Sequence, residues 1–321
     1  MNGKLVVSIS PHIRAPETVS SVMIDVLVAL FPAALASVLL FGYNALLVIV
    51  VSVVAAMVAE TAMQGIMYRK LALLGDGSAA VTGLLLALTL PANVPWWMPV
   101  VGSVCAIVIA KQLFGGLGNN IFNPALVGRA ILTLSWGTYM VGTIWPEPRL
   151  FQPAADVTTA ATPLEGPSYA QEVTLQELFL GNVTGSLGET SALALILGAF
   201  WLFYKGHIDW RIPGGYLVTV FSMGALWGEG VYHGELLTGL FHVLAGGVLL
   251  GALFMATDLV TSPVTPWGRL IFGIGCGVVT MIIRLFGIYP EGVTFAILLM
   301  NAVTPIIDKI TIPKKFGEVK K

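Results

Sequence analysis

A run of threonines near the middle of the chain ends at a Thr-Pro pair, within the segment 156–164, which reads DVTTAATPL. Threonine before proline favours extended backbone, and the pair often starts a helix, with the threonine as its cap and the proline at its first position. The hydroxyl of Thr162 is also a possible site of covalent attachment. Because an unaided threonine hydroxyl is a poor nucleophile, such attachment would need a separate enzyme. The residue types leave both roles open.

Carboxylates in or at the ends of apolar blocks are the second group of chemical candidates. Charged groups inside a membrane are costly and therefore often functional. We select Glu60, Asp258, Glu291 and Asp308 as candidates for an ion pathway. The alternative for each is a helix-end carboxylate at the lipid–water boundary, and for Glu291 the helix dipole alone favours an acid.

Metal-binding patterns are absent from the sequence. The two cysteines, Cys105 and Cys276, lie in apolar blocks and belong to no CxxC motif. The four histidines are scattered, without the spacing of a metal or haem pair. We therefore expect no metal site in this chain and interpret the cysteines as small buried hydrophobes.

The elements that position these residues are apolar blocks. The chain has 321 residues, of which 56% are hydrophobic and 10% are charged, against about 25% charged in soluble domains. Ten apolar blocks can be counted, most of them long enough to cross about 30 Å of hydrocarbon. They lie near 20–41, 45–66, 78–92, 97–114, 121–142, 190–204, 214–230, 236–256, 268–286 and 291–308. The sequence predicts an all-α polytopic membrane protein, and the net charge of −1 gives no indication of a nucleic-acid partner.

Lysines and arginines set the expected orientation. With ten alternating spans and both termini in the cytoplasm, 14 basic residues fall on or near the inner side and two, Arg149 and Arg284, toward the outer side. Arg129 could offset an acidic group or a flavin phosphate, but its expected inner position argues against contact with a phosphate on Thr162. The predicted organisation is a first five-helix unit (1–142), an outer loop (143–189), a second five-helix unit (190–308) and a basic cytoplasmic tail (309–321).

The two units show weak self-similarity. Pro91 precedes Phe114 by 23 residues, and Pro263 precedes Phe286 by the same number. Since five is an odd number of spans, a duplicated five-span unit must be inverted relative to its copy, and such folds place their sites at the repeat interface on interrupted helices. We therefore expect two inverted five-helix repeats.

The threonine segment matches the D-x-x-[ST]-x-A-T pattern modified by flavin transferases outside the cytoplasmic membrane. Asp156, Thr159, Ala161 and Thr162 occupy its defined positions. The resemblance implies that Thr162 carries FMN through a phosphoester. The predicted outer location of the loop, obtained independently of the motif, agrees with attachment on that side.

Most of the chain resembles one family of membrane proteins. The segments that carry the resemblance are SPHIRAP (10–16), FGGLGNNIFNPALVGRA (114–130), DVTTAATPL, ATDLVTSP (256–263) and YPEGVTFAILLMNAVTPIID (289–308). The family comprises the D-type component of Rnf complexes, the ferredoxin:NAD oxidoreductases that move Na+ or H+, and the B-type component of the Na+-pumping NADH:quinone reductase. The first apolar block begins near residue 20, without the longer extension of the second type, which favours the first. The motif at 256–263 departs from the family's usual T-D-P, because Leu259 follows Asp258.

The resemblance implies a urea-transporter-like fold and an electron-transfer role in the cytoplasmic membrane. It also implies a second covalent-FMN subunit and iron–sulfur subunits as partners, a noncovalent riboflavin as a further cofactor, and no catalysis by this chain alone. Two alternatives stay open at this point: a component of the quinone-reductase type, and a passive urea-transporter-like channel in which Thr162 is only a loop residue.

Overall fold

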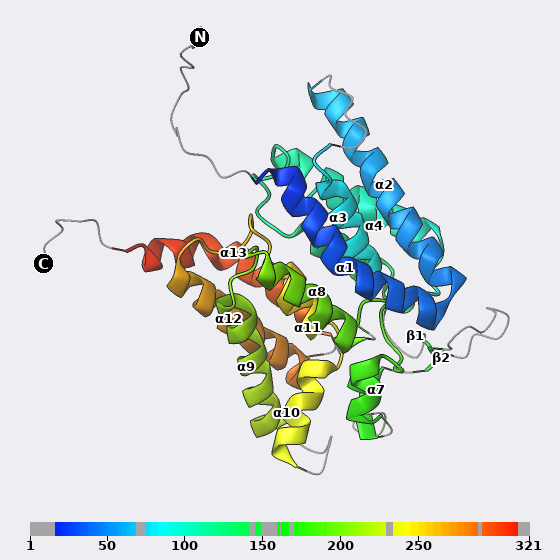
Figure 1. Ribbon diagram of the computed structural model, residues 1–321, viewed down its shortest axis with the longest axis vertical. Helices are drawn as coiled ribbons and strands as arrows, with labels where there is room; N and C mark the ends of the chain where they lie inside the picture. Colours follow the sequence, from blue (N-terminus) through cyan, green and yellow to red (C-terminus); the bar gives the residue numbers. More distant parts are fainter. Residues whose placement is uncertain are drawn as a thin grey trace, which may run out of the picture.

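The computed structural model describes residues 17–68, 75–140, 145–148, 159–160, 162–166, 170–171, 173–189, 191–228, 234–287 and 291–313. Helices dominate these residues (Figure 1). They are α1 (Val19–Phe41), α2 (Tyr43–Tyr68), α3 (Ser78–Leu88), α4 (Trp97–Val108), α5 (Pro124–Ser135), α7 (Leu175–Leu180), α8 (Ala192–Tyr204), α9 (Arg211–Trp227), α10 (Glu235–Leu244), α11 (Val248–Leu250), α12 (Pro266–Phe286) and α13 (Val293–Thr311). A two-stranded pair, β1 (Trp145–Pro146) and β2 (Thr159–Ala160), lies between α5 and α7 in the chain.

Helix packing follows the same order in both halves of the chain. In the first half, α2 packs against α3 and α4, and α4 packs against α5. In the second half, α9 packs against α10 and α12, and α12 packs against α13. The halves meet where α1 packs on α8 and α5 on α13. This parallel is compatible with the expected duplication, and the inverted repeat stays a prediction.

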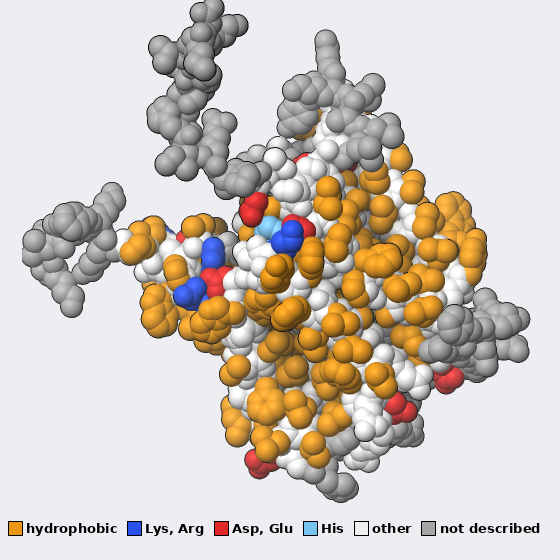
Figure 2. Space-filling model, viewed as in Figure 1, with side chains coloured by type: hydrophobic (Ala, Val, Ile, Leu, Met, Phe, Trp, Pro, Cys, Tyr) orange, Lys and Arg blue, Asp and Glu red, His pale blue; other side chains and the backbone are white. Residues whose placement is uncertain are grey.

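Five helices are long and apolar enough to cross a membrane, or six if one bent pair counts as a single span. This agrees with a polytopic membrane protein, although ten full-length spans are not observed among the described residues. The outward side chains of α1, α2 and α8 include Phe31, Val58 and Phe200, each more than 60% exposed. Figure 2 shows a broad hydrophobic face with few charges, as expected for a surface that contacts lipid.

The third predicted span is shortened in the structure, and the eighth is broken. Helix α3 has 11 residues, about 17 Å of helix, and nearly all of its side chains are buried. The eighth predicted block (236–256) is not one straight helix, because α10 and the helical segment Val248–Met255 bend by 66° at a break. Gly246 in the break has a φ of +67°, a conformation that glycine adopts readily and that ends an α-helix.

The fifth span is also shorter than expected. Its helix α5 begins only at Pro124, with Asn123 as its cap: the Asn123 side-chain oxygen accepts from the Ala125 and Leu126 amides. The Asn123 side-chain amide donates to the backbone oxygen of Met255, at 3.2 Å. Met255 ends a π-helical turn, Gly251–Met255, which continues α11. The start of α5 is thus fixed to the broken helix of the other half.

Candidate functional site

Thr162 occupies the cap position of a 3₁₀ turn, Pro163–Glu165, with extended backbone (φ −72°, ψ 154°). The cap placement expected for a Thr-Pro pair is therefore observed, but the hydroxyl makes no capping hydrogen bond. Its side chain is only 3% exposed, and its oxygen has no hydrogen-bond partner among the described residues. Because buried hydroxyls normally find a partner, this one needs another explanation.

Two neighbouring structures hold the Thr162 turn in place. Directly before it, β2 pairs antiparallel with β1, with Trp145 opposite Ala160. Directly after it, Leu164 packs on an apolar cluster that joins α7 and α10 and includes Leu178 and Phe241. The turn is therefore held on both sides by elements that lie outside the long apolar helices.

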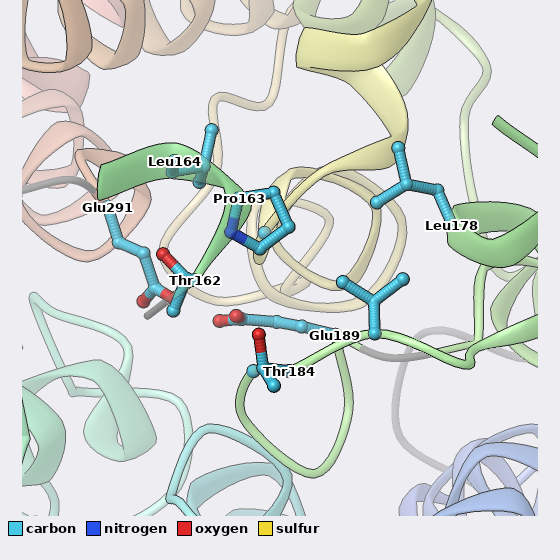
Figure 3. A pocket seen from close by; sticks show the side chains of 10 residues that line it. Thr162, Pro163, Leu164, Leu178, Thr184, Glu189 and Glu291 are labelled. Atoms are coloured by element: carbon cyan, nitrogen blue, oxygen red, sulfur yellow. The ribbon is translucent and has the colours of Figure 1, made fainter. Parts of the chain in front are cut away.

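A small pocket adjoins Thr162, with a cavity volume of about 10 Å³, roughly that of one water molecule. Its lining is mixed: Pro163, Leu164 and Leu178 are apolar, whereas Thr184, Glu189 and Glu291 present oxygen atoms. Figure 3 shows the Thr162, Glu189 and Glu291 side chains converging on one hollow from different segments of the chain. The pocket is thus an oxygen-rich space beneath the threonine.

Arg129 lies between the two glutamates of the pocket. Its guanidinium pairs with Glu189 at 3.5 Å and, through its other terminal nitrogen, with Glu291. The side chains of all three residues are at most 10% exposed. These ion pairs confirm that Arg129 offsets acidic groups. They also place it beside the residues that line the Thr162 pocket, although the expected orientation puts Arg129 and Thr162 on opposite sides. Helix α5, which carries Arg129, begins at the broken helix of the other half.

A second arginine stabilises the neighbouring break between α10 and α11. The guanidinium of Arg284, in α12, donates to the backbone oxygens of His242 at 2.7 Å and Ala245 at 2.9 Å. These carbonyls stand at the end of α10, where intrahelical donors are lacking. The charges of Arg284 and Glu189 also interact. The buried Arg129 and Glu189 and the partly buried Arg284 and Glu291 thus form a group of charges at the Thr162 pocket, which the two glutamates line.

A larger cavity of about 550 Å³ lies elsewhere between the two halves of the chain. It is lined by parts of α1 and α3, by residues 117–124 and by residues 257–260. Lys111 reaches this cavity although it is only 1% exposed. Its ammonium group donates to Glu60 and to the Ser78 hydroxyl, both at 2.5 Å, and Gln112 donates to the same Glu60 oxygen at 2.9 Å.

Asp76 completes this inner group of charges by accepting hydrogen bonds from the amide and hydroxyl of Ser78. Burial raises the pKa of Asp76, but the Ser78 hydrogen bonds and the charge of Lys111 outweigh that effect and leave the pKa lowered. Asp76 therefore stays ionised at neutral pH. Together Asp76, Lys111 and Glu60 form a chain of charges at one end of the large cavity.

The remaining predicted residues fall at different places. Asp258 lines the large cavity and accepts from the Thr261 hydroxyl at 3.1 Å. Asp308 accepts from the Val264 amide at 3.0 Å, which fixes the 261–265 segment to α13. Thr159 lies in β2, whereas Asp156 and Ala161 lie outside the described residues. The four ion candidates are thus divided: Glu60 and Asp258 lie near the large cavity, Asp308 lies in α13 and is bonded to the adjacent 261–265 segment, and Glu291 lies at Thr162.

Comparisons with known proteins cover nearly the whole chain. Residues 6–317 match the model of the NQR2, RnfD, RnfE family. The chain belongs to this family. It is 46% identical to the D-type component of the Na+-translocating ferredoxin:NAD+ oxidoreductase complex of Acetobacterium woodii, covering 98% of this chain and 96% of that protein.

Two further relatives of the NQR2, RnfD, RnfE family carry related names. One is the D-type component of the proton-translocating ferredoxin:NAD+ oxidoreductase complex of Clostridium ljungdahlii, 46% identical over 97% of this chain and 96% of the relative. The other is the D-type component of the ion-translocating oxidoreductase complex of Stutzerimonas stutzeri, 42% identical over 94% of this chain and 92% of the relative. The relatives from Acetobacterium woodii and Clostridium ljungdahlii are both 46% identical to this chain, yet one is named for Na+ and the other for the proton. Overall similarity therefore does not identify an ion for this chain.

The Thr162 site has features that suit a phosphate-linked cofactor. Its hydroxyl is buried without a partner among the described residues, and Arg129 is held within the same cluster. Guanidinium groups pair well with phosphate oxygens. The pocket has room for about one water molecule, so both the phosphate group and the flavin ring would lie outside it.

Sequence reasoning missed Glu189 and Lys111 as site residues, and it considered Arg129 but assigned it to the other side of the membrane. Each is a charge inside or directly beside an apolar block, which could have marked it as a candidate. The sequence places Glu189 at the end of the outer loop, and Lys111 enters only the count that sets orientation. Which acidic residue pairs with which basic residue depends on where the helices break. The lengths of the apolar blocks do not show these breaks.

Proposed function

We propose that this chain is the membrane-embedded D-type component of an ion-translocating ferredoxin:NAD+ oxidoreductase complex, and that it carries covalent FMN on Thr162. Family membership and the names of the relatives support the complex. The observation that carries the cofactor assignment is the buried, unpartnered Thr162 hydroxyl at the last position of the flavin-attachment motif. Bound FMN would supply one- and two-electron transfer at this point.

The proposed arrangement places the chain in the cytoplasmic membrane with both termini inside and residues 143–189 outside. Ten membrane crossings in two inverted, urea-transporter-like halves would account for the shared packing order. Moving Arg129 to the outer group changes the count of basic residues from 14 against 2 to 13 against 3, which preserves the orientation. A second covalent-FMN subunit and iron–sulfur subunits would be the redox partners, and a flavin transferase would load Thr162.

The large cavity supports a second, noncovalent flavin such as riboflavin. Its volume of about 550 Å³ lies within the range of cofactor pockets, about 300–1,000 Å³. Apolar side chains such as Val22 and Leu85 line it together with the polar Asn120 and Lys111. Such a mixed lining suits an aromatic ring with a polar edge.

The ion pathway would use the acidic residues near this cavity and at Thr162. Glu60 and Asp258 would gather Na+ or H+ at the inner end, with Asp308 holding the adjacent segment, and Glu291 would act at the outer end. Asp308→Asn should lower ion transport or its ion dependence, measured in vesicles that contain the complex. Unchanged ion-coupled turnover would remove Asp308 from the pathway.

Covalent attachment is tested on a denaturing gel. The chain is produced together with the flavin transferase, and in-gel fluorescence is recorded for wild type, Thr162→Val and Thr184→Val. Thr184 lines the same pocket and is the matched control. We expect fluorescence in wild type and Thr184→Val and none in Thr162→Val. A dark wild-type band with an active transferase would contradict the cofactor assignment and leave the channel alternative.

A further inference from the structure

Two arginines at the starts of α9 and α12 share one carboxylate, on the side that the proposed orientation places in the cytoplasm. The guanidinium groups of Arg211 and Arg269 each donate to the same oxygen of Asp209, both at 2.8 Å. Arg269 also donates through its Nε to the Pro263 carbonyl at 3.1 Å. The two arginine side chains are 38% and 33% exposed, so a ligand can reach both. This arginine pair, Arg211 and Arg269, thus converges on one accessible point.

The helices that carry the arginine pair begin side by side. A Cβ at Gly273 of α12 would clash with the Ile212 carbonyl of α9, so the two backbones touch there. A Cβ at Gly215 of α9 would in turn lie 3.2 Å from the Leu270 carbonyl oxygen of α12. Because these contacts fall in the early turns of both helices, their N-termini lie on the same side. The positive dipole ends of two helices therefore add to the charge of the arginine pair.

The charged groups of the described residues around the arginine pair leave an excess of positive charge. Burial raises the pKa of Asp209, but hydrogen bonds from the Arg211 amide and from both guanidinium groups outweigh that effect and leave the pKa lowered, so Asp209 is ionised at neutral pH. In α13, Asp308 is already hydrogen-bonded to a backbone amide, and the exposed Lys309 follows it. Three basic residues, Arg211, Arg269 and Lys309, thus stand against two acidic ones. The sequence after α13 also contains more lysines than acidic residues.

Exposed aromatic and apolar side chains adjoin the arginine pair, as at a lipid headgroup boundary. Trp210 and Trp267 are 64% and 71% exposed, and the Arg211 guanidinium lies 5.5 Å from the Trp210 ring centre. Tryptophan is enriched at this level of a membrane. From Arg211 an exposed stripe of α9 continues through Val218 and Leu226, at steps of about two helical turns. In Figure 2 a group of basic and acidic side chains near the start of α12 lies beside a wide hydrophobic surface.

We propose that the arginine pair and the exposed stripe of α9 bind one anionic phospholipid, such as a phosphatidylglycerol, at the inner surface of the membrane. The phosphate group lies between the two guanidinium groups, and one acyl chain follows the stripe. Arginine has more N–H donors than the described bonds use, and its fork matches phosphate oxygens. Basic pockets between membrane helices on the cytoplasmic side recognise anionic lipids in this way. The site goes beyond the proposed function and does not depend on a flavin.

Asp209 sets the strength of this lipid site. Its carboxylate holds the two guanidinium groups together, but it also competes with a phosphate group for the same N–H donors. Removal of its charge should therefore tighten lipid binding. If Asp209 only stabilised the turn before α9, its replacement would weaken lipid binding instead.

The test measures lipid binding to the detergent-solubilised complex. Tritiated dioleoylphosphatidylglycerol and dioleoylphosphatidylcholine are titrated separately in the same neutral detergent, with glycerol 3-phosphate as competitor. The forms compared are wild type, Arg211→Gln, Arg269→Gln, Arg269→Lys, Asp209→Asn and, as matched control, Lys205→Gln. Lys205 is also a partly exposed basic residue (39%) that pairs with a carboxylate, Asp25, at 3.5 Å and lies over a tryptophan ring.

We expect wild type to bind the phosphatidylglycerol about tenfold more tightly than the phosphatidylcholine, since each basic residue near the surface contributes to the attraction. Arg211→Gln and Arg269→Gln should lose this preference, Asp209→Asn should strengthen it, and Lys205→Gln should leave it unchanged. Arg269→Lys keeps the charge and should keep part of the preference, which covers the case in which Arg269→Gln fails to assemble.

Four outcomes would overturn the lipid site. They are equal binding of the two lipids by wild type, an equal loss in Lys205→Gln, a weakened preference in Asp209→Asn, and full displacement of the lipid by glycerol 3-phosphate. The last outcome would mean that the arginine pair binds a free phosphate group and not a lipid. None of them bears on flavin attachment, which is measured separately by in-gel fluorescence.

Discussion

Two ion-pair clusters among the described residues, around Lys111 and around Arg129, differ in how fully their carboxylates are engaged. In the Lys111 cluster, one Glu60 oxygen receives hydrogen bonds from both Lys111 and Gln112, beside a cavity of about 550 Å³. In the Arg129 cluster, one arginine is shared by two glutamates, beside a pocket of about 10 Å³. Glu60 is held by two donors, whereas Glu291 keeps one oxygen unpartnered among the described residues.

This difference indicates which cluster has a basic residue that can change its partner. Lysine is a compact point charge on a flexible stem, so Lys111 can follow a ligand that enters the large cavity. Arginine presents a rigid fork, so Arg129 fixes the geometry of two acids at once. The Lys111 cluster thus lies beside room for a ligand, whereas the Arg129 cluster lies beside room for about one water molecule.

Replacement of Arg129 should have the largest effect. Arg129→Gln strands two buried carboxylates, so we expect a loss of about 3–5 kcal/mol in stability, as for a broken buried ion pair. The measurement is the thermal unfolding of the detergent-solubilised complex. The double variant Arg129→Gln/Glu291→Gln should recover part of the loss. No recovery would mean that Glu291 is not the stranded group.

Replacement of Lys111 should come next. Lys111→Met removes the cationic partner of Glu60, which keeps its bond from Gln112, so the expected loss is smaller, about 2–3 kcal/mol. The same unfolding assay applies, and Lys111→Met/Glu60→Gln should approach wild type. A loss larger than that of Arg129→Gln would reverse the ranking of the two clusters.

A pair of glycine variants gives the smallest and most specific comparison. Gly246 and Gly118 both have positive φ, +67° and +95°. A Cβ at Gly246 would lie 2.6 Å from a Leu164 methyl and 2.9 Å from an Arg284 nitrogen, whereas a Cβ at Gly118 would have nothing within 4 Å. Each Ala variant should lose about 1–2 kcal/mol from backbone strain. Gly246→Ala should in addition shift the Thr162 turn and lower flavin attachment on the gel, which Gly118→Ala should leave unchanged.

Much of the molecule could be predicted from the sequence. The contacts and helix ends that depend on tertiary partners could not. Long apolar runs such as α1, α2 and α12 are predicted within a few residues, because lipid-facing helices carry their signal in composition alone. Thr162 stands out through its motif, and the cap position of its turn is expected from Thr-Pro. The pairing of Arg129 with Glu291 could not be predicted, since the two residues lie 162 positions apart and meet where α5 packs on the α13 end of the other half.

The ends of the helices that are buried within the protein could also not be predicted from the sequence. Apolar composition cannot distinguish a helix that faces lipid from a shorter one that faces other helices. Asn123, Gly246 and the prolines mark these interruptions locally, but whether an interruption ends a helix or only kinks it depends on its tertiary partners. The Asn123 bond to Met255 is such a partner, contributed by the other half of the chain.

The short helix α3 has a consequence for how the protein is made. Its 11 residues cannot reach across a bilayer, and its buried side chains require α2 and α4 as neighbours. Its backbone ends would be left unsatisfied in hydrocarbon if it entered alone. We therefore expect α3 to enter the membrane together with α4, as one hairpin that packs against the already inserted α2. Membrane insertion of this half would then proceed in pairs of helices.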